Sequence, residues 1–134
     1  MIRPAGILAL SLAAATPASA ADPALAFRVE GTEIAVPPFG ARAVPAADAS
    51  GQGIIIITLA DGVARAFGKL TGDNVGKVLE IVICGAVALS PRLEKPIYGN
   101  EVHVSGGIDM ATATELSRRI SAGDCAGFTS PFKP

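Results

Sequence analysis

The stretch Ile54-Ile55-Ile56-Ile57-Thr58-Leu59 decides the fold of this chain. These six consecutive residues are too few for a stable helix, and in an extended segment they place apolar side chains on both faces. Such a run is typical of a strand inside a sheet. We therefore predict a central strand over residues 54–59, and the other elements are built outward from it.

An amphipathic helix is predicted directly after this strand. Asp61 is a candidate N-cap, and Asn74-Val75-Gly76 supplies stop signals at the other end. Between them, four apolar residues recur at i, i+3, i+4 and i+7, which is the spacing of one helix face: Val63, Ala66, Phe67 and Leu70. We expect this face to be buried.

Three more strands are predicted downstream of the helix. Residues 77–84 form a β-branched apolar run that turns at Gly85 into residues 86–89, and this pattern predicts a hairpin. Residues 101–105 alternate strictly between polar and apolar types. They predict a strand with one buried face.

A second helix is predicted over residues 110–121. Asp109 is its expected N-cap and Gly123 its C-terminal stop. The buried stripe is expected to contain Met110, Ala113, Leu116 and Ile120. Together with the first helix, this element completes the predicted helical content.

The N-terminal part, residues 21–50, is poor in helix signals because prolines interrupt it. Residues 25–30 and 33–36 flank Gly31-Thr32 and predict a two-strand hairpin. Residues 37–53 are expected to form an irregular crossing or a weak strand. The whole pattern predicts an α+β fold: an antiparallel or mixed sheet with two amphipathic helices packed on one face, in a single small domain.

Charge excludes nucleic acid as a partner. The chain of 134 residues has 11 Lys and Arg against 12 Asp and Glu, a formal net charge of -1. Its longest basic run is the pair Arg118-Arg119. Binding to phosphates needs a clustered excess of basic side chains, which this sequence lacks.

The first twenty residues have the pattern of a secretory signal peptide. Arg3 precedes an apolar stretch over residues 7–15, and Ala18-Ser19-Ala20 forms an A-x-A site. The alternative, a transmembrane anchor, needs about 20 apolar residues. We therefore expect cleavage after Ala20, a mature chain without a transmembrane segment, and a location in the periplasm, with the extracellular medium as the alternative.

No group of residues indicates a catalytic, cofactor-binding or metal site. His103, the single His, shares a strand face with Glu101 and Ser105. Residues two apart on a strand are about 7 Å apart at the backbone and their side chains point in parallel, which does not suit a nucleophile and its base. One His and two distant Cys do not match metal-ligand spacings, and the glycines match no phosphate-binding loop. We expect no enzyme and no cofactor, with a small hydrolase assembled from distant segments left as an open alternative.

Several segments resemble the head subdomain of the first periplasmic domain of SecD, a membrane partner of the Sec protein-export machinery. The most specific is Leu70-Thr71-Gly72-Asp73-Asn74-Val75-Gly76-Lys77, followed by Ser90-Pro91-Arg92-Leu93 and Val104-Ser105-Gly106-Gly107-Ile108. The resemblance covers about residues 51–124. It implies an α+β module that assists late protein export by engaging polypeptide, although the family's transmembrane motifs are not found in this sequence.

The resulting domain organisation has four parts. A signal peptide covers residues 1–20, N-terminal strands and an irregular connection cover residues 21–50, a SecD-head-like domain covers residues 51–127, and a tail covers residues 128–134. Chain length allows one domain.

The two cysteines are candidates for a disulfide. Cys84 and Cys125 form an even pair in a chain predicted to be exported, and export permits disulfides. The alternative is a buried free Cys84 that packs as a small apolar residue, with Cys125 loose in the tail.

Two function classes remain. The leading hypothesis is a non-enzymatic module of the cell envelope that binds polypeptide or another envelope protein through an exposed sheet edge or face. The alternative is a small-ligand-binding or enzyme-accessory domain of the periplasm, with a pocket between helix and sheet. Oligomeric state has no signature in the sequence.

Overall fold

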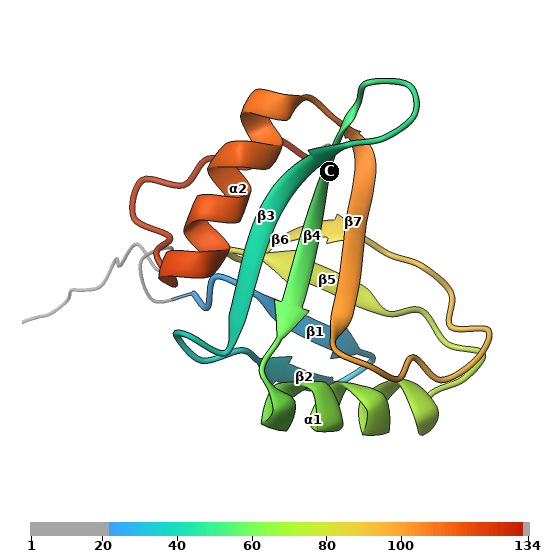
Figure 1. Cartoon of the computed structure of the whole chain (residues 1–134). Helices are drawn as coiled ribbons and strands as arrows, with labels where there is room; N and C mark the ends of the chain where they lie inside the picture. The colour runs from blue at the N-terminus through green and yellow to red at the C-terminus, as the bar shows by residue number, and fades with distance from the viewer. Residues whose placement is uncertain (1–21, 133–134) are drawn as a thin grey trace, which may run out of the picture.

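The computed structural model describes residues 22–132, which form two antiparallel sheets and two helices (Figure 1). The predicted signal peptide lies outside these residues. The α+β class is confirmed, but the strands are divided between two sheets. Each helix packs on a different sheet, so the two helices do not share one face of a single sheet as expected.

The first sheet consists of two hairpins laid side by side. Its order is β2 (Thr32–Ala35), β1 (Ala26–Val29), β5 (Glu80–Ile83) and β6 (Ala86–Leu89), with every pair antiparallel. Both hairpins were predicted. The second one turns at Cys84 and Gly85, whose φ angles of 49° and 84° match the two-residue turn that suits the twist of paired strands.

The second sheet is built on the apolar run of residues 54–59. Its order is β3 (Ala41–Ala47), β4 (Gly53–Leu59) and β7 (Glu101–Ile108), so β4 is central as predicted. Of the two expectations for residues 37–53, an irregular crossing or a weak strand, the strand is the correct one, and β3 is a full strand. It tolerates Pro45 because an edge strand has neighbours on one side only, and a missing N–H on the other side costs no ladder bond.

The helices lie at different ends of the molecule. α2 (Met110–Ala122) packs on β3 and β4. α1 (Asp61–Gly72) lies below both sheets in Figure 1 and reaches the first sheet through Phe67, whose ring centroid is 4.4 Å from that of Phe27 on β1. Among residues 22–132, no helix is long and apolar enough to cross a membrane.

The buried face of α1 is rotated from the predicted one. Phe67 and Leu70 are buried as expected, but Ala66 is exposed, and Gly68 and Thr71 are buried in its place. A Cβ at Gly68 would lie 3.3 Å from the Tyr98 ring, so the absence of a side chain lets the neighbouring loop close on this side of the helix. The buried face of α1 is therefore rotated because of Gly68, which the prediction from the spacing of apolar side chains left out.

The helix ends were predicted with mixed success. Asp109 accepts a hydrogen bond of 2.7 Å from the Thr112 N–H, and Gly123 ends α2 in the left-handed conformation, both as predicted. Asp61 is the first residue of α1 and not its cap. The capping position is held by Ala60, which has no side-chain acceptor. Met110, predicted to be buried, is 39% exposed because it begins the helix beyond the edge of the core.

One hydrophobic cluster joins both sheets and both helices. It contains the larger apolar residues that the sequence places inward: Phe67, Leu70, Ile81, Ile83, Val104, Leu116 and Ile120. This shared core fixes the positions of both sheets and of their edge strands. One of these edge strands, β6, carries the candidate site.

Candidate functional site

β6 is an edge strand with an unpaired outer side. It pairs only with β5 in the first sheet, and its four residues are all half-buried. Ala88 has no partner in the register, because Ile81 faces Leu89 and Val82 faces Val87. The bulge and the short length discourage extended pairing between two copies of the chain, but the outer backbone groups still lack a ladder partner within the described residues.

A groove of about 790 Å³ follows this edge. It is lined by the five consecutive residues from Ala86 to Ser90 on one side and by Ser130 and Phe132 on the other. Side chains alternate between the two faces of a strand, so a groove lined by every residue in turn lies along the strand's edge and not over one face. None of the described residues that line it is charged.

The opposite wall of the groove is the C-terminal segment. Phe128 and Phe132 are partly buried and pack against the hydrophobic cluster. Ser130 and Phe132 are held together locally, with the Phe132 N–H donating to the Ser130 hydroxyl over 3.1 Å. A segment predicted as a tail is therefore part of the site.

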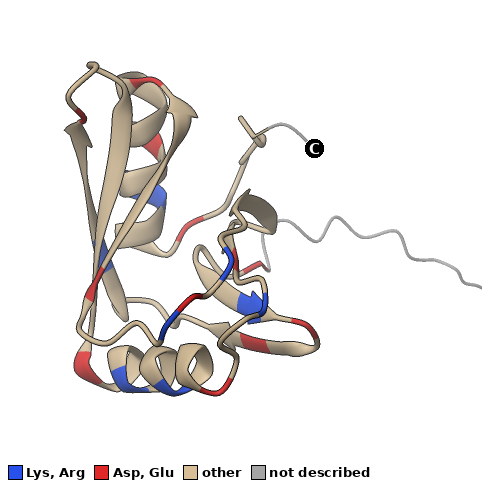
Figure 2. Cartoon of the chain, turned by 90° about the vertical axis from the view of Figure 1, so that its right-hand side faces the viewer, with Lys and Arg blue, Asp and Glu red and all other residues tan. Residues whose placement is uncertain are grey.

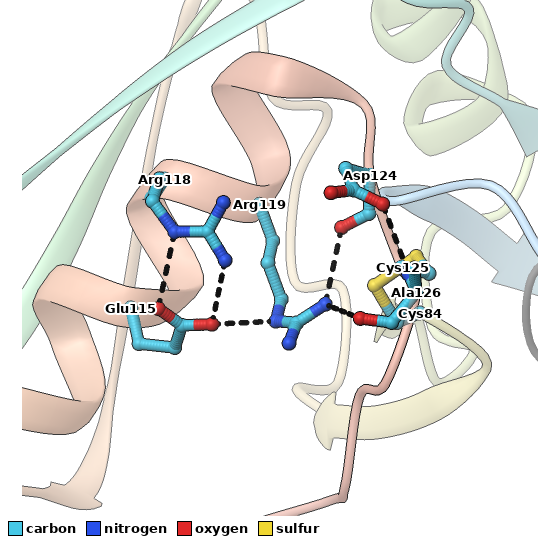
Figure 3. Close-up of polar contacts among 7 residues, drawn as sticks. All are labelled: Cys84, Glu115, Arg118, Arg119, Asp124, Cys125 and Ala126. Carbon is cyan, nitrogen blue, oxygen red and sulfur yellow. Dashed lines mark hydrogen bonds and ion pairs between the residues drawn. A yellow bond between two sulfur atoms is a disulfide. The ribbon is translucent and has the colours of Figure 1, made fainter.

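A disulfide anchors this segment at its start. Cys84 at the turn before β6 is bonded to Cys125, and their Cα atoms lie 5.5 Å apart (Figure 3). The bond joins the two cysteines that were predicted to pair. It fixes the beginning of the C-terminal segment next to the beginning of β6.

Arg119 of α2 adds a second anchor (Figure 3). Its guanidinium donates to the carbonyl of Ala126 over 2.8 Å and pairs with the Glu115 carboxylate at 2.8 Å. Glu115 also accepts from Arg118, and this hydrogen bond is the main reason that the pKa of Glu115 lies below its ordinary value. The Arg119 guanidinium lies 5.6 Å from the centre of the Phe128 ring, a cation–π contact.

A second hollow, of about 770 Å³, lies over α1. Tyr98, which is 76% exposed, extends along the helix beside Gly68 and Gly72, and the charged residues around it have both signs. This hollow is the place where the alternative hypothesis of a small ligand can be tested. Its described lining concentrates neither one kind of charge nor a set of buried polar groups.

The surface offers little chemistry elsewhere. Acidic and basic residues are interspersed along the chain (Figure 2). His103 lies 2.9 Å from Glu101 on β7, but both side chains are more than half exposed, and no hydrogen bond joins Ser105 to this pair among the described residues. In residues 22–132 no three His, Cys, Asp or Glu side chains come together as a metal site.

The C-terminal wall of the groove was not predicted from the sequence. Its signal was present as two aromatic residues four positions apart, Phe128 and Phe132, in a stretch that is otherwise polar or rich in Gly and Pro. Large aromatic side chains gain much free energy by burial, so their presence in a tail indicates that the tail packs on something.

Comparisons with known proteins agree on one family. The model of the SecDF P1 head subdomain matches residues 39–126. The protein translocase subunit SecD of Acidaminococcus fermentans is 32% identical over 77 residues, covering 58% of this chain and 18% of the relative. SecD of Acetobacter pasteurianus is 39% identical over 59 residues, covering 44% of this chain and 11% of the relative.

Solved structures give the same result. A structure described as a membrane component SecDF that enhances protein export superposes with a TM-score of 0.59 at 26% identity, covering 63% of this chain and 38% of that one. The chain spans less than a fifth of the length of the two SecD relatives. With a family match over residues 39–126, this chain belongs to the SecDF P1 head subdomain family.

Proposed function

We propose that this chain is a polypeptide-binding module that acts in protein export and takes an extended segment of polypeptide as an added strand on the outer edge of β6. The observation that carries the proposal is an edge strand whose outer backbone groups have no ladder partner among residues 22–132, beside a groove whose described lining residues carry no charge. An extended peptide placed there gains main-chain hydrogen bonds with β6, and its side chains meet the apolar walls.

Strand addition suits polypeptides that are being exported because it depends only weakly on their amino-acid sequence. Main-chain hydrogen bonds supply the affinity, and the pockets for alternate side chains supply the selectivity. The groove selects against charge because burial of an unpaired charge is costly, and it accepts many apolar segments. The relatives are described as subunits of a protein translocase and as a component that enhances protein export, which fits a partner of this kind.

The proposal includes no chemical step. The module binds and releases polypeptide in the periplasm, with the protein or polypeptide of the envelope as its partner and with no cofactor. A hydrolase needs a nucleophile, a base and an orienting group in mutual contact. The exposed pair of His103 and Glu101 supplies two of these without the third.

A binding measurement with two matched peptides tests the proposal. The first is a short fluorescent peptide of alternating Val and Thr with Lys at both ends, here named the Val-Thr peptide. The second replaces every second residue with Pro, which removes N–H donors on one edge and cannot form a ladder. We expect the fluorescence anisotropy of the first to rise with protein concentration and that of the second to stay flat; equal binding of both peptides would refute strand addition.

A further inference from the structure

We infer that residues 127–132, named the C-terminal strap, are a built-in competitor for the β6 groove: they form one wall of it, close onto β6 for part of the time in the free protein, and are displaced when an extended polypeptide carrying apolar or aromatic side chains binds. This inference rests on the proposed function and adds a regulation of the same site. It also names the chemistry of the partner, because the strap itself shows what the groove accepts.

The strap begins where strong anchoring ends. Up to Ala126 the chain is fixed by the disulfide of Cys125 and by Arg119, which donates to the carbonyls of Asp124 and Ala126. Gly127 follows in the left-handed conformation, with a φ of 70°, and a Cβ added to it would meet no described heavy atom within 4 Å. This glycine marks the point at which the strap can change direction at low cost.

Beyond Gly127 the strap is held mainly by apolar contact. Phe128 and Phe132 pack against the hydrophobic cluster, and the guanidinium of Arg119 lies over the Phe128 ring. Past Phe128, the hydrogen bonds found in the described part of the strap join Ser130 to Phe132 and none joins it to β6. A polypeptide that adds backbone hydrogen bonds along β6 therefore gains a kind of contact that the strap does not make.

The position of the strap places it directly against any peptide bound in this groove. Ser130 and Phe132 line the groove opposite Ala86 to Ser90. The same strap, through Phe128, Thr129 and Pro131, lines a smaller hollow of about 270 Å³ against α2. The strap thus lies between α2 and β6, where a shift of Ser130 and Phe132 toward β6 closes the groove and a shift away from β6 widens it.

The strap also defines the substrate class. Its six residues are two Phe, one Pro, one Thr, one Ser and one Gly, and none is charged. We therefore assign the groove to uncharged polypeptide segments that carry apolar or aromatic side chains. Segments rich in Asp, Glu, Lys or Arg are excluded by the same burial cost that keeps charge out of the groove.

Three forms of the otherwise intact protein test the inference with the Val-Thr peptide. The Phe132→Ala variant removes one contact of the strap. A variant ending at Ala126 removes the strap but keeps the disulfide, the Arg119 contact with the Asp124 carbonyl, and an Ala126 oxygen, now part of the terminal carboxylate, for Arg119. Phe39→Ala is the matched control, since Phe39 is an exposed aromatic in a different turn. Thermal melting of each variant shows that it is folded.

The expected result is tighter binding when the strap is weakened. If the strap covers the groove about nine-tenths of the time, its removal tightens the apparent Kd about tenfold, with a smaller gain for Phe132→Ala and none for Phe39→Ala. An acetylated peptide with the sequence of residues 127–134, added to the protein that ends at Ala126, should displace the Val-Thr peptide.

The contrary outcomes distinguish a failure of the strap inference from a failure of the proposed polypeptide binding. Equal or weaker binding after strap removal, or no displacement by the strap peptide, overturns the inference and leaves polypeptide binding standing. Absence of Val-Thr peptide binding in every form, including the one without the strap, overturns the proposed function itself and the competition with it.

Discussion

Gly53, the first residue of β4, shows how closely single residues are constrained at the contact between β4 and α2. A Cβ placed on it would lie 2.5 Å from the backbone oxygen of Asp109 and 3.0 Å from the Ala113 side chain. These neighbours are backbone and a buried helix residue, so neither can move away cheaply. The position needs glycine for close approach and not for turn geometry.

We predict that Gly53→Ala lowers the free energy of unfolding, because the added methyl group pushes α2 away from the sheet; overpacking of this kind typically costs about 1–3 kcal/mol. The matched control is Gly62→Ala in α1, where the nearest atom to the new methyl is 3.9 Å away. There the change should stabilise the protein by up to about 1 kcal/mol through helix propensity. Urea unfolding checks both, and a neutral Gly53→Ala would contradict the close packing of α2.

Asp109 gives a prediction about pH. The hydrogen bond from the Thr112 N–H lowers the pKa of this carboxyl below its ordinary value of 3.8, so the folded state favours the charged form. The stabilisation is present above the ordinary pKa and is lost as pH falls through the lower, folded-state pKa. The variant Asp109→Asn keeps an acceptor for Thr112 without the titrating charge.

We therefore expect the unfolding free energy of Asp109→Asn to fall less than that of the unmodified protein as pH is lowered from about 5 to about 2. Urea unfolding at stepwise pH measures the difference. An equally steep acid loss in both proteins would show that the cap does not contribute to it.

At the scale of elements, a comparison of two edge strands, β6 and β3, tests where the proposed site lies. Val87 lies on β6 beside the groove, and Val44 lies on β3, which is also an edge strand. A lysine on an edge strand discourages pairing with an incoming strand. The two valines therefore form a matched pair for substitution.

We predict that Val87→Lys weakens binding of the Val-Thr peptide about tenfold, equivalent to about 1.4 kcal/mol, and that Val44→Lys leaves it unchanged. Fluorescence anisotropy measures both. Weaker binding in Val44→Lys alone would move the site to the other sheet.

Local signals predicted most elements, and contacts between distant segments explain the exceptions. The apolar run of β4, the hairpin turn at Gly85 and the Asp109 cap depend on neighbouring residues, so they could be predicted from the sequence. The rotated face of α1 depends on Tyr98 closing over Gly68, which lies far earlier in the chain, and no local pattern contains that contact.

The candidate site was predicted only in kind. An exposed sheet edge was expected, but the choice of β6 follows from the sheet order, which places β5 beside β1 and leaves β6 outside. The strand predicted over residues 101–105 extends to Ile108. Gly106 and Gly107 lie within β7, at the register shift between β4 and β7, where the pairing jumps from Ser105 to Ile108.

At the scale of the whole molecule, the disulfide joins the turn before β6 to the segment after α2. The two cysteines are 41 positions apart. Closing such a loop lowers the entropy of the unfolded chain, which stabilises the folded state by roughly 4 kcal/mol in the chain-entropy model. The bond therefore stabilises the fold and holds the start of the strap in place.

We predict that the double variant Cys84→Ala/Cys125→Ala unfolds at a lower urea concentration, with a loss of up to roughly 4 kcal/mol. Thiol titration of the denatured, unreduced protein is the matching chemical check and should find no free thiol. Two free thiols per chain, or a loss below about 1 kcal/mol in the variant, would contradict this role of the bond.

Hydrogen exchange of the backbone amides, with and without the Val-Thr peptide, tests the central claim most directly. Strand addition at the outer edge of β6 protects amides that water reaches in the free protein, so we predict slower exchange within Ala86–Leu89 when the peptide is bound and unchanged exchange in β2, the other edge of the same sheet. Protection confined to β2 or to the hollow over α1, with none in β6, would contradict the account.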